Sequence, residues 1–161
     1  MNWRIKTHLA PLAGLLLAAL LLGGCGGDYG PDQHGTQVSA KTLDEQWLVI
    51  NYWAVWCGPC RREIPELNAL LQSLEGQGVR VIGVNFDNLQ GDELSAAAKT
   101  LGIDFTVLAQ DPAPRFELPR SQALPITYII DAQGKVRDQL LGEQTAAGIK
   151  ARLTALQRGE S

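Results

Sequence analysis

The chain has 161 residues, of which 45% are hydrophobic and 19% charged, and its formal net charge is −3. This length and composition suit one globular domain with a hydrophobic core and exclude a disordered chain. The small acidic excess, without a basic stripe, argues against a protein that binds nucleic acid.

The first 24 residues have the pattern of an export signal. Residues 1–8 carry two basic side chains, Arg4 and Lys6, and no acid, and the apolar run Leu9–Leu22 follows them. This run is shorter than the roughly 20 residues that a membrane-spanning helix needs, and it has the length of a signal-peptide core. We therefore expect residues 1–24 to be a signal peptide that is removed on export.

The sequence LGGC, which ends at Cys25, resembles the bacterial lipobox, in which the cysteine is lipidated and becomes the mature N-terminus. An ordinary signal peptide with a chance cysteine is the alternative. Cleavage before Cys25 would leave 12 basic and 17 acidic residues, a net charge of −5, so membrane attachment would rest on acyl chains alone. Gly26 after the cysteine resembles lipoproteins of the Gram-negative outer membrane, which predicts an anchored protein that faces the periplasm.

The segment behind the predicted anchor is rich in glycine and polar residues and has no apolar periodicity. Such a composition is typical of a flexible linker. We therefore predict a flexible tether over residues 25–37 and a folded domain over residues 38–161.

Strands and helices alternate along the predicted domain. Trp47–Val55 is a nearly continuous apolar run, typical of a strand buried on both faces, and a helix follows it with leucines spaced along one face. Further strands are predicted at Val79–Asp87, Phe105–Gln110, Leu124–Asp131 and Lys135–Gly142, and further helices at Asp92–Leu101, Pro112–Leu118 and Thr145–Gln157. This order predicts an α/β sandwich in which helices cover both faces of a mixed sheet.

Cys57 and Cys60, in the sequence WCGPC, are compatible with a metal site, a structural disulfide or a redox centre. A structural zinc site needs four ligands, but the two histidines are His8 in the predicted signal and His34 in the predicted tether. A disulfide between residues three apart closes too small a loop to restrain the unfolded chain much. Redox exchange is favoured because Cys57 lies where a strand meets a helix N-terminus, whose dipole stabilises a thiolate. The pattern predicts an exposed nucleophile at Cys57 and a shielded resolving thiol at Cys60.

The sequence WAVWCGPC, residues 53–60, resembles the active site of the thioredoxin superfamily. The longer pattern is similar to the TlpA/ResA-like branch of membrane-tethered, extracytoplasmic thiol-disulfide oxidoreductases. Asn51 stands where cytoplasmic thioredoxins have a buried Asp, Glu63 follows Cys60 by three residues, and LPITYIID, residues 124–131, resembles the proline strand of the branch. The helix and strand predicted within residues 92–108 resemble its central helix-strand insertion. The resemblance covers residues 38–157 and implies a thioredoxin fold.

The same resemblance implies a role for each site residue. Cys57 would attack a substrate disulfide, and Cys60 would resolve the mixed disulfide. Pro125 would be a cis-proline that faces the cysteines, and Leu124 would offer backbone groups to a substrate peptide. Glu63 would accept the proton of Cys60, although spacing alone equally permits a simple interaction with the helix dipole. The expected substrate-binding residues are Trp56, Gly58, Pro59, Leu124 and Pro125.

The resemblance implies thiol-disulfide exchange in the reducing direction, with disulfides of envelope proteins, apocytochrome c among them, as the candidate substrates. We expect a monomer that needs no cofactor other than its own Cys57–Cys60 disulfide and that receives electrons from a DsbD-like membrane donor, because the compartment is oxidising.

Two other functions use the same fold and cysteine pair. A thioredoxin-fold chaperone or adaptor that holds Cu(I) between the cysteines is the alternative, since thiolates suit a soft metal. Peroxidase chemistry is disfavoured, because Ala54 and Ile50 occupy the positions at which peroxiredoxins have Thr and Pro before the nucleophile.

Overall fold

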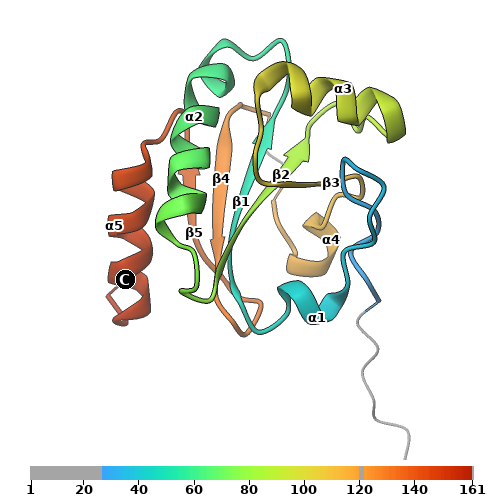
Figure 1. Ribbon diagram of the computed structural model, residues 1–161. Coiled ribbons are helices and arrows are strands. Elements are labelled where there is room, and N and C mark those ends of the chain that lie inside the picture. The colour runs from blue at the N-terminus through green and yellow to red at the C-terminus, as the bar shows by residue number, and fades with distance from the viewer. Residues whose placement is uncertain (1–26, 120–121, 161) are drawn as a thin grey trace, which may run out of the picture.

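The computed structural model describes residues 27–119 and 122–160, so the predicted signal peptide and Cys25 lie outside the described residues. Within these residues the strands form one sheet in the order β3-β2-β1-β4-β5 (Figure 1). β1, β2 and β3 run parallel, whereas β4 pairs antiparallel with β1, and β5 antiparallel with β4. The strands are β1 (Trp47–Trp53), β2 (Val79–Asn85), β3 (Thr106–Leu108), β4 (Ile126–Ile130) and β5 (Val136–Leu141).

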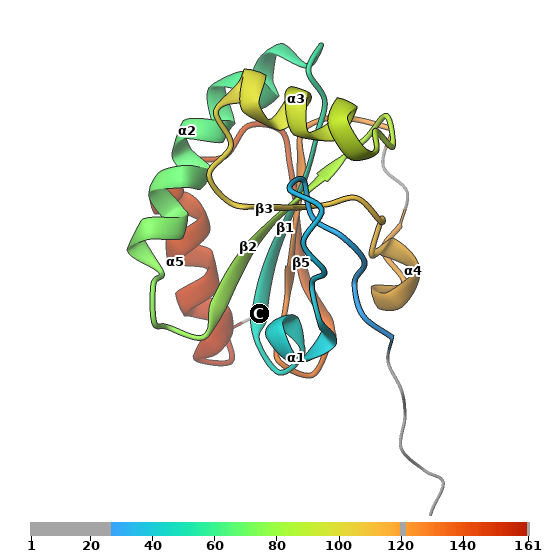
Figure 2. The ribbon, with the colours of Figure 1, turned by 45° about the vertical axis from the view of Figure 1, so that its right-hand side comes forward.

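Helices cover both faces of this sheet. They are α1 (Ala40–Leu43), α2 (Gly58–Ser73), α3 (Gly91–Leu101), α4 (Ala113–Phe116) and α5 (Ala146–Gln157). Figure 2 shows α2 and α5 on one side of the sheet and α1 and α4 on the other. Leu67 of α2, Leu94 of α3 and Leu153 of α5 share one buried cluster, and Leu43 of α1 belongs to the other. The predicted α/β sandwich is therefore confirmed.

The predicted elements agree with the observed ones except at some ends and at α1, which has no counterpart among the predicted elements. The last helix begins after Thr145, whose side chain accepts a hydrogen bond from the Gly148 backbone nitrogen at 3.1 Å. This contact makes Thr145 the N-cap residue of α5. Across residues 27–119 and 122–160, no helix combines the length and the apolar character required to cross a membrane.

The N-terminal segment is packed rather than free. Tyr29 and Gln33 are only 5% and 6% exposed. The Gln33 side chain donates to the Phe105 carbonyl at 3.1 Å and accepts from the Val107 backbone nitrogen at 2.7 Å. The prediction of a flexible tether is therefore wrong for residues 29–37. The composition of the segment resembles a linker, but the polar side chain of Gln33 is bound by the backbone of Phe105 and Val107, far along the chain.

Replacing Gln33 with alanine should lower the free energy of unfolding by about 1–3 kcal/mol, because two backbone groups at the sheet edge would lose their partner. Urea unfolding of the mature chain measures this loss. Gln37→Ala is the matched control, since Gln37 lies in the same segment with an exposed side chain. If Gln33→Ala were as stable as the control, the segment would not be part of the folded domain.

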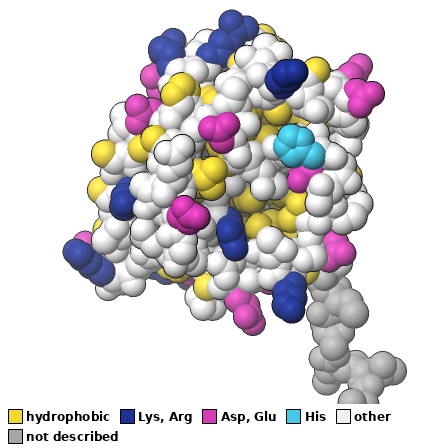
Figure 3. Space-filling view, in the orientation of Figure 1, with side chains coloured by type: hydrophobic (Ala, Val, Ile, Leu, Met, Phe, Trp, Pro, Cys, Tyr) yellow, Lys and Arg dark blue, Asp and Glu magenta, His cyan; other side chains and the backbone are white. Residues whose placement is uncertain are grey.

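Charged side chains of both signs are interspersed over the face shown in Figure 3. On the face shown in Figure 3, Lys and Arg side chains alternate with Asp and Glu side chains rather than gathering into one basic area. This distribution agrees with the small net charge of the chain.

Candidate active site

The two cysteines lie at the connection between the end of β1 and the start of α2. β1 ends at Trp53 and α2 begins at Gly58, so Cys57 is the N-cap residue of the helix. Cys57 and Cys60 form a disulfide with an S–S distance of 2.08 Å and a Cα–Cα distance of 5.3 Å. The Cys60 backbone nitrogen donates to the Cys57 sulfur at 3.2 Å. An amide of the helix N-terminus is thus directed at the sulfur that would carry the thiolate.

The two sulfur-bearing residues differ less in exposure than expected. Cys57 is 4% exposed and Cys60 is 1% exposed. Both belong to the buried cluster that includes Trp53, so the oxidised pair is almost covered. The neighbouring Gly58 and Pro59 are exposed. The prediction of an exposed nucleophile at Cys57 is therefore wrong for the oxidised pair, in which both cysteines are buried beneath an exposed turn.

Pro125 lies at the same end of the sheet. Antiparallel pairing places Tyr52 opposite Ile126, so the end of β1 lies beside the start of β4. The Leu124–Pro125 peptide bond is cis, as the resemblance implied. Pro125 is buried, its carbonyl accepts from the Gly142 backbone nitrogen at 2.9 Å, and Leu124 is half-buried. The fold thus brings Leu124 and Pro125 to the end of the sheet that carries the cysteines.

An exposed aromatic pair borders the disulfide. Trp56 is 63% exposed and packs edge-on against Phe86, which is 40% exposed, with ring centroids 6.3 Å apart. The Trp56 indole nitrogen donates to the Asp87 carboxylate at 3.0 Å. Phe86 was not predicted as a site residue. Its position directly after the predicted strand could have indicated this role, because the carboxyl ends of neighbouring parallel strands lie at the same end of a sheet.

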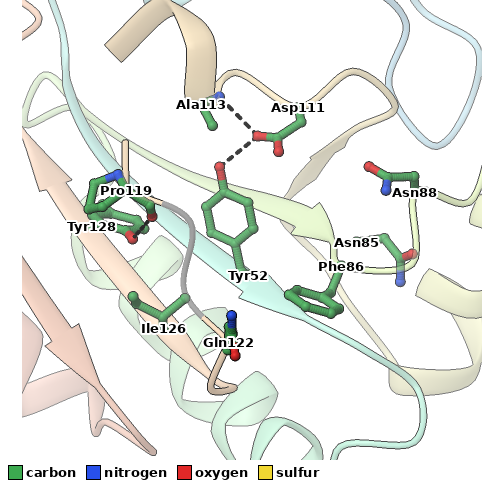
Figure 4. Close-up of a pocket in the computed structure, with 10 residues that line it drawn as sticks. All are labelled: Tyr52, Asn85, Phe86, Asn88, Asp111, Ala113, Pro119, Gln122, Ile126 and Tyr128. Carbon is green, nitrogen blue, oxygen red and sulfur yellow. Dashed lines mark hydrogen bonds between the residues drawn. The ribbon is translucent and has the colours of Figure 1, made fainter. Parts of the chain in front are cut away.

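A cavity of about 400 Å³ lies beside Phe86, on the face of the sheet opposite α2 (Figure 4). Figure 4 shows Tyr52 at its centre, with its hydroxyl donating to Asp111 at 2.6 Å. The Ala113 backbone nitrogen donates to the same carboxylate at 2.9 Å. Burial, together with this hydrogen bond and the nearby charge of Asp111, raises the pKa of Tyr52 well above its usual range. The phenol therefore stays neutral and fixed, and Ile126 continues the apolar wall.

Glu63 is buried inside the domain, with 0% of its surface exposed. The Asn51 side-chain nitrogen donates to its Oε2 at 2.8 Å, and the Gln144 backbone nitrogen donates to its Oε1 at 3.1 Å. Burial raises the pKa of Glu63 to about 7, against the lowering effect of these two hydrogen bonds, and the Glu143 charge raises it further. Since Glu63 lies one turn after Cys60 on α2, a group that can hold or release a proton near neutral pH lies close to the resolving cysteine.

Comparisons with known proteins agree with this site. A sequence profile of the AhpC/TSA family matches residues 29–139. Thiol-disulfide oxidoreductase ResA of Bacillus thuringiensis (strain Al Hakam) is 31% identical over 118 residues, which are 71% of this chain and 65% of the relative. Thiol:disulfide interchange protein HelX of Rhodobacter capsulatus is 30% identical over 121 residues, 74% of this chain and 66% of the relative. The chain thus spans slightly less than two thirds of the length of these curated relatives.

A solved structure extends the likeness to the fold. The thiol:disulfide interchange protein of the thioredoxin family from Chlorobium tepidum TLS has a TM-score of 0.66 and 25% identity, and the match covers 78% of this chain and 89% of that one. The expected thioredoxin fold is therefore confirmed.

Proposed function

The chain belongs to the AhpC/TSA family of the thioredoxin superfamily, and we propose that it is a thiol-disulfide oxidoreductase that reduces protein disulfides outside the cytoplasm. The observation that carries this proposal is the Cys57–Cys60 disulfide at the N-terminus of α2, at the end of the sheet where cis-Pro125 also lies. The names of the ResA and HelX relatives support the same reaction. Within this family, Ala54 and Ile50 argue against peroxidase chemistry at Cys57.

The reaction begins from the reduced pair. The Cys57 thiolate attacks one sulfur of a substrate disulfide, so that a mixed disulfide forms and the other substrate sulfur leaves as a thiolate and takes up a proton. The deprotonated Cys60 then attacks the Cys57 sulfur, which forms the Cys57–Cys60 disulfide and releases the second substrate thiol. The substrate disulfide gains two electrons, and the chain is oxidised by the same two.

Glu63 is the proposed acceptor for the Cys60 proton. A pKa of about 7 matches the task, because a base works best when it is poised near the ambient pH. The hydrogen bonds from Asn51 and Gln144 support the carboxylate once Glu63 has lost its proton.

Trp56, Gly58, Pro59, Leu124 and Pro125 are the proposed contacts for the substrate polypeptide. The exposed ring of Trp56 offers apolar area next to the nucleophile. Gly58 leaves open space, since a Cβ added there would meet nothing within 4 Å. Phe86 extends this surface through its contact with Trp56.

The finer assignments are parts of the same proposal. Substrates would be disulfide-containing envelope proteins such as apocytochrome c, and a DsbD-like membrane protein would supply electrons, because an oxidising compartment cannot keep the pair reduced. The chain would act as a monomer, held by a lipid on Cys25 at the periplasmic face of the outer membrane. The net charge of −3 and the mixed charges on the face in Figure 3 argue against a nucleic-acid partner.

Insulin reduction tests the proposed function. The purified mature chain, with dithiothreitol as electron source, should accelerate the precipitation of insulin chains far above the rate of dithiothreitol alone. The same preparation is titrated with Cu(I) under reducing conditions. Stoichiometric Cu(I) binding without any insulin reduction would contradict the oxidoreductase and favour the copper chaperone.

A further inference from the structure

A row of three buried polar side chains joins the proline-bearing strand to the helix of the cysteines. Thr127 of β4, Asn51 of β1 and Glu63 of α2 are each 0% exposed. Asn51 lies directly opposite Thr127 in the antiparallel pairing of the two strands. The Asn51 side-chain nitrogen donates to Thr127 Oγ1 at 2.9 Å and to Glu63 Oε2 at 2.8 Å.

The Asn51 amide uses both of its hydrogens in this row. Its oxygen, Oδ1, is buried and has no hydrogen-bond partner among the described residues. The orientation of the amide therefore depends on the two groups that accept from its nitrogen. An ionised carboxylate can only accept, so Glu63 needs the nitrogen of Asn51 and not the oxygen to face it. The unpartnered Oδ1 of Asn51 lowers the stability of the folded protein, whereas the same orientation of the amide places a hydrogen-bond donor at Glu63.

Packing alone does not explain why a polar residue, Thr127, stands at this position of β4. Its neighbours in β4, Ile126 and Tyr128, are buried, and the whole strand is covered. Valine has the same branched shape, suits a strand equally well and leaves no hydroxyl to desolvate. The hydroxyl at this position accepts from the Asn51 side-chain nitrogen, which also donates to Glu63.

We propose that Thr127 is a positioning residue for proton transfer in the exchange reaction. Its hydroxyl accepts one hydrogen of Asn51 and thereby holds the other against Glu63, which sets how readily Glu63 takes up and releases the Cys60 proton. This inference rests on the proposed function, in which Glu63 accepts that proton.

The charged groups around Glu63 come from α2 and from the loop between β5 and α5. Glu143 is paired with Arg62 at 2.7 Å, and Glu66 accepts from the Ala146 backbone nitrogen at 2.9 Å. The titratable thiols of the reduced protein, Cys57 and Cys60, precede Glu63 on the same side of the domain. From β1 and β4, Asn51 and Thr127 bring hydrogen bonds but no charge. Removal of the Thr127 hydroxyl therefore alters the support of Glu63 without changing any charge near it.

The test is a titration of the Glu63 side-chain carboxyl by carbon-13 NMR in the full mature chain with the disulfide formed. Thr127→Val should raise the pKa of Glu63 by about 0.5 or more, because a less firmly held donor supports the carboxylate less well. Thr127→Ser keeps the hydroxyl and should leave the pKa of Glu63 as in the wild type. Thr127→Ala also lacks the hydroxyl and should shift the pKa in the same direction as Thr127→Val, which guards against a packing effect of one variant.

A double substitution shows whether Thr127 acts through Asn51. In an Asn51→Ala background, Thr127→Val should produce no further shift in the pKa of Glu63. An unchanged pKa in Thr127→Val, an equal shift in Thr127→Ser, or an undiminished shift in the Asn51→Ala background would each overturn the positioning role.

The NMR readout separates this inference from the proposed function. If the wild-type chain failed to reduce insulin but Thr127→Val still raised the pKa of Glu63, the proposed function would fail while the structural role of the hydroxyl would be supported. If insulin reduction were normal and the pKa did not move, only the positioning role would be lost. In an active protein, the pH profile of the resolving step should move to higher pH in Thr127→Val and return in Thr127→Ser.

Discussion

Cys57→Ser is expected to abolish insulin reduction, leaving only the rate of dithiothreitol alone. The first step of exchange requires a thiolate at the helix N-terminus, and a serine hydroxyl does not ionise there at neutral pH or attack a disulfide. Cys60 is not expected to take over the attack, because it lies within the first turn of α2, behind the N-cap position that Cys57 occupies. The loss of activity should therefore be complete rather than partial.

The insulin turbidity assay measures this loss, and Cys25→Ser is the matched control. Cys25 is the remaining cysteine of the chain, so its replacement leaves the Cys57–Cys60 pair as the sole source of thiol chemistry. The control should reduce insulin at the wild-type rate. Substantial activity in Cys57→Ser would show that another group begins the reaction.

Glu63 should have a large effect on stability as well as on exchange. Its pKa is raised from 4.5 to about 7 by burial, so between these pH values the folded protein holds a proton that the unfolded chain releases. The free energy of unfolding should therefore fall as the pH rises through this window, by about 3 kcal/mol in total. Below the lower value both states are protonated, and the penalty is absent.

Glu63→Gln removes this penalty because glutamine stays neutral. The stability of the variant relative to the wild type should grow by about 3 kcal/mol from below pH 4.5 to above pH 7, the two pKa limits of Glu63. Urea unfolding at a series of pH values, with the disulfide intact, gives the difference, and Glu75→Gln at an exposed position of the same region controls for the loss of one carboxylate. Parallel stability curves for wild type and Glu63→Gln would contradict a carboxyl group that titrates near neutral pH.

The features that could be predicted from sequence depend on neighbours along the chain. The place of Cys57 before α2 follows from an apolar strand, a proline in the first helical turn and a leucine-spaced helix, all adjacent to the motif. The cis-proline at 125 followed from the resemblance and not from the base rate of such bonds, which favours trans.

The features that escaped prediction depend on contacts between distant residues. Gln33 has the neighbours of a linker residue, but its side chain is bound by the backbone of Phe105 and Val107, more than 70 positions away. The spacing of Glu63 left its role open, since the raised pKa comes from burial and its supporting donors lie 12 and 81 positions away, on Asn51 and Gln144. Phe86 likewise reaches the site through its contact with Trp56.

The identity of the sulfur that first bonds to substrate is the most direct test of the account. Cells that produce Cys60→Ser should accumulate mixed disulfides, because the attack by Cys57 proceeds while the resolving thiol is absent. Mass spectrometry of the trapped adducts, after alkylation and digestion, should find the substrate peptide linked to Cys57. Adducts linked elsewhere, or no adduct in Cys60→Ser cells under conditions in which the protein is fully reduced, would contradict an exchange mechanism that begins at Cys57.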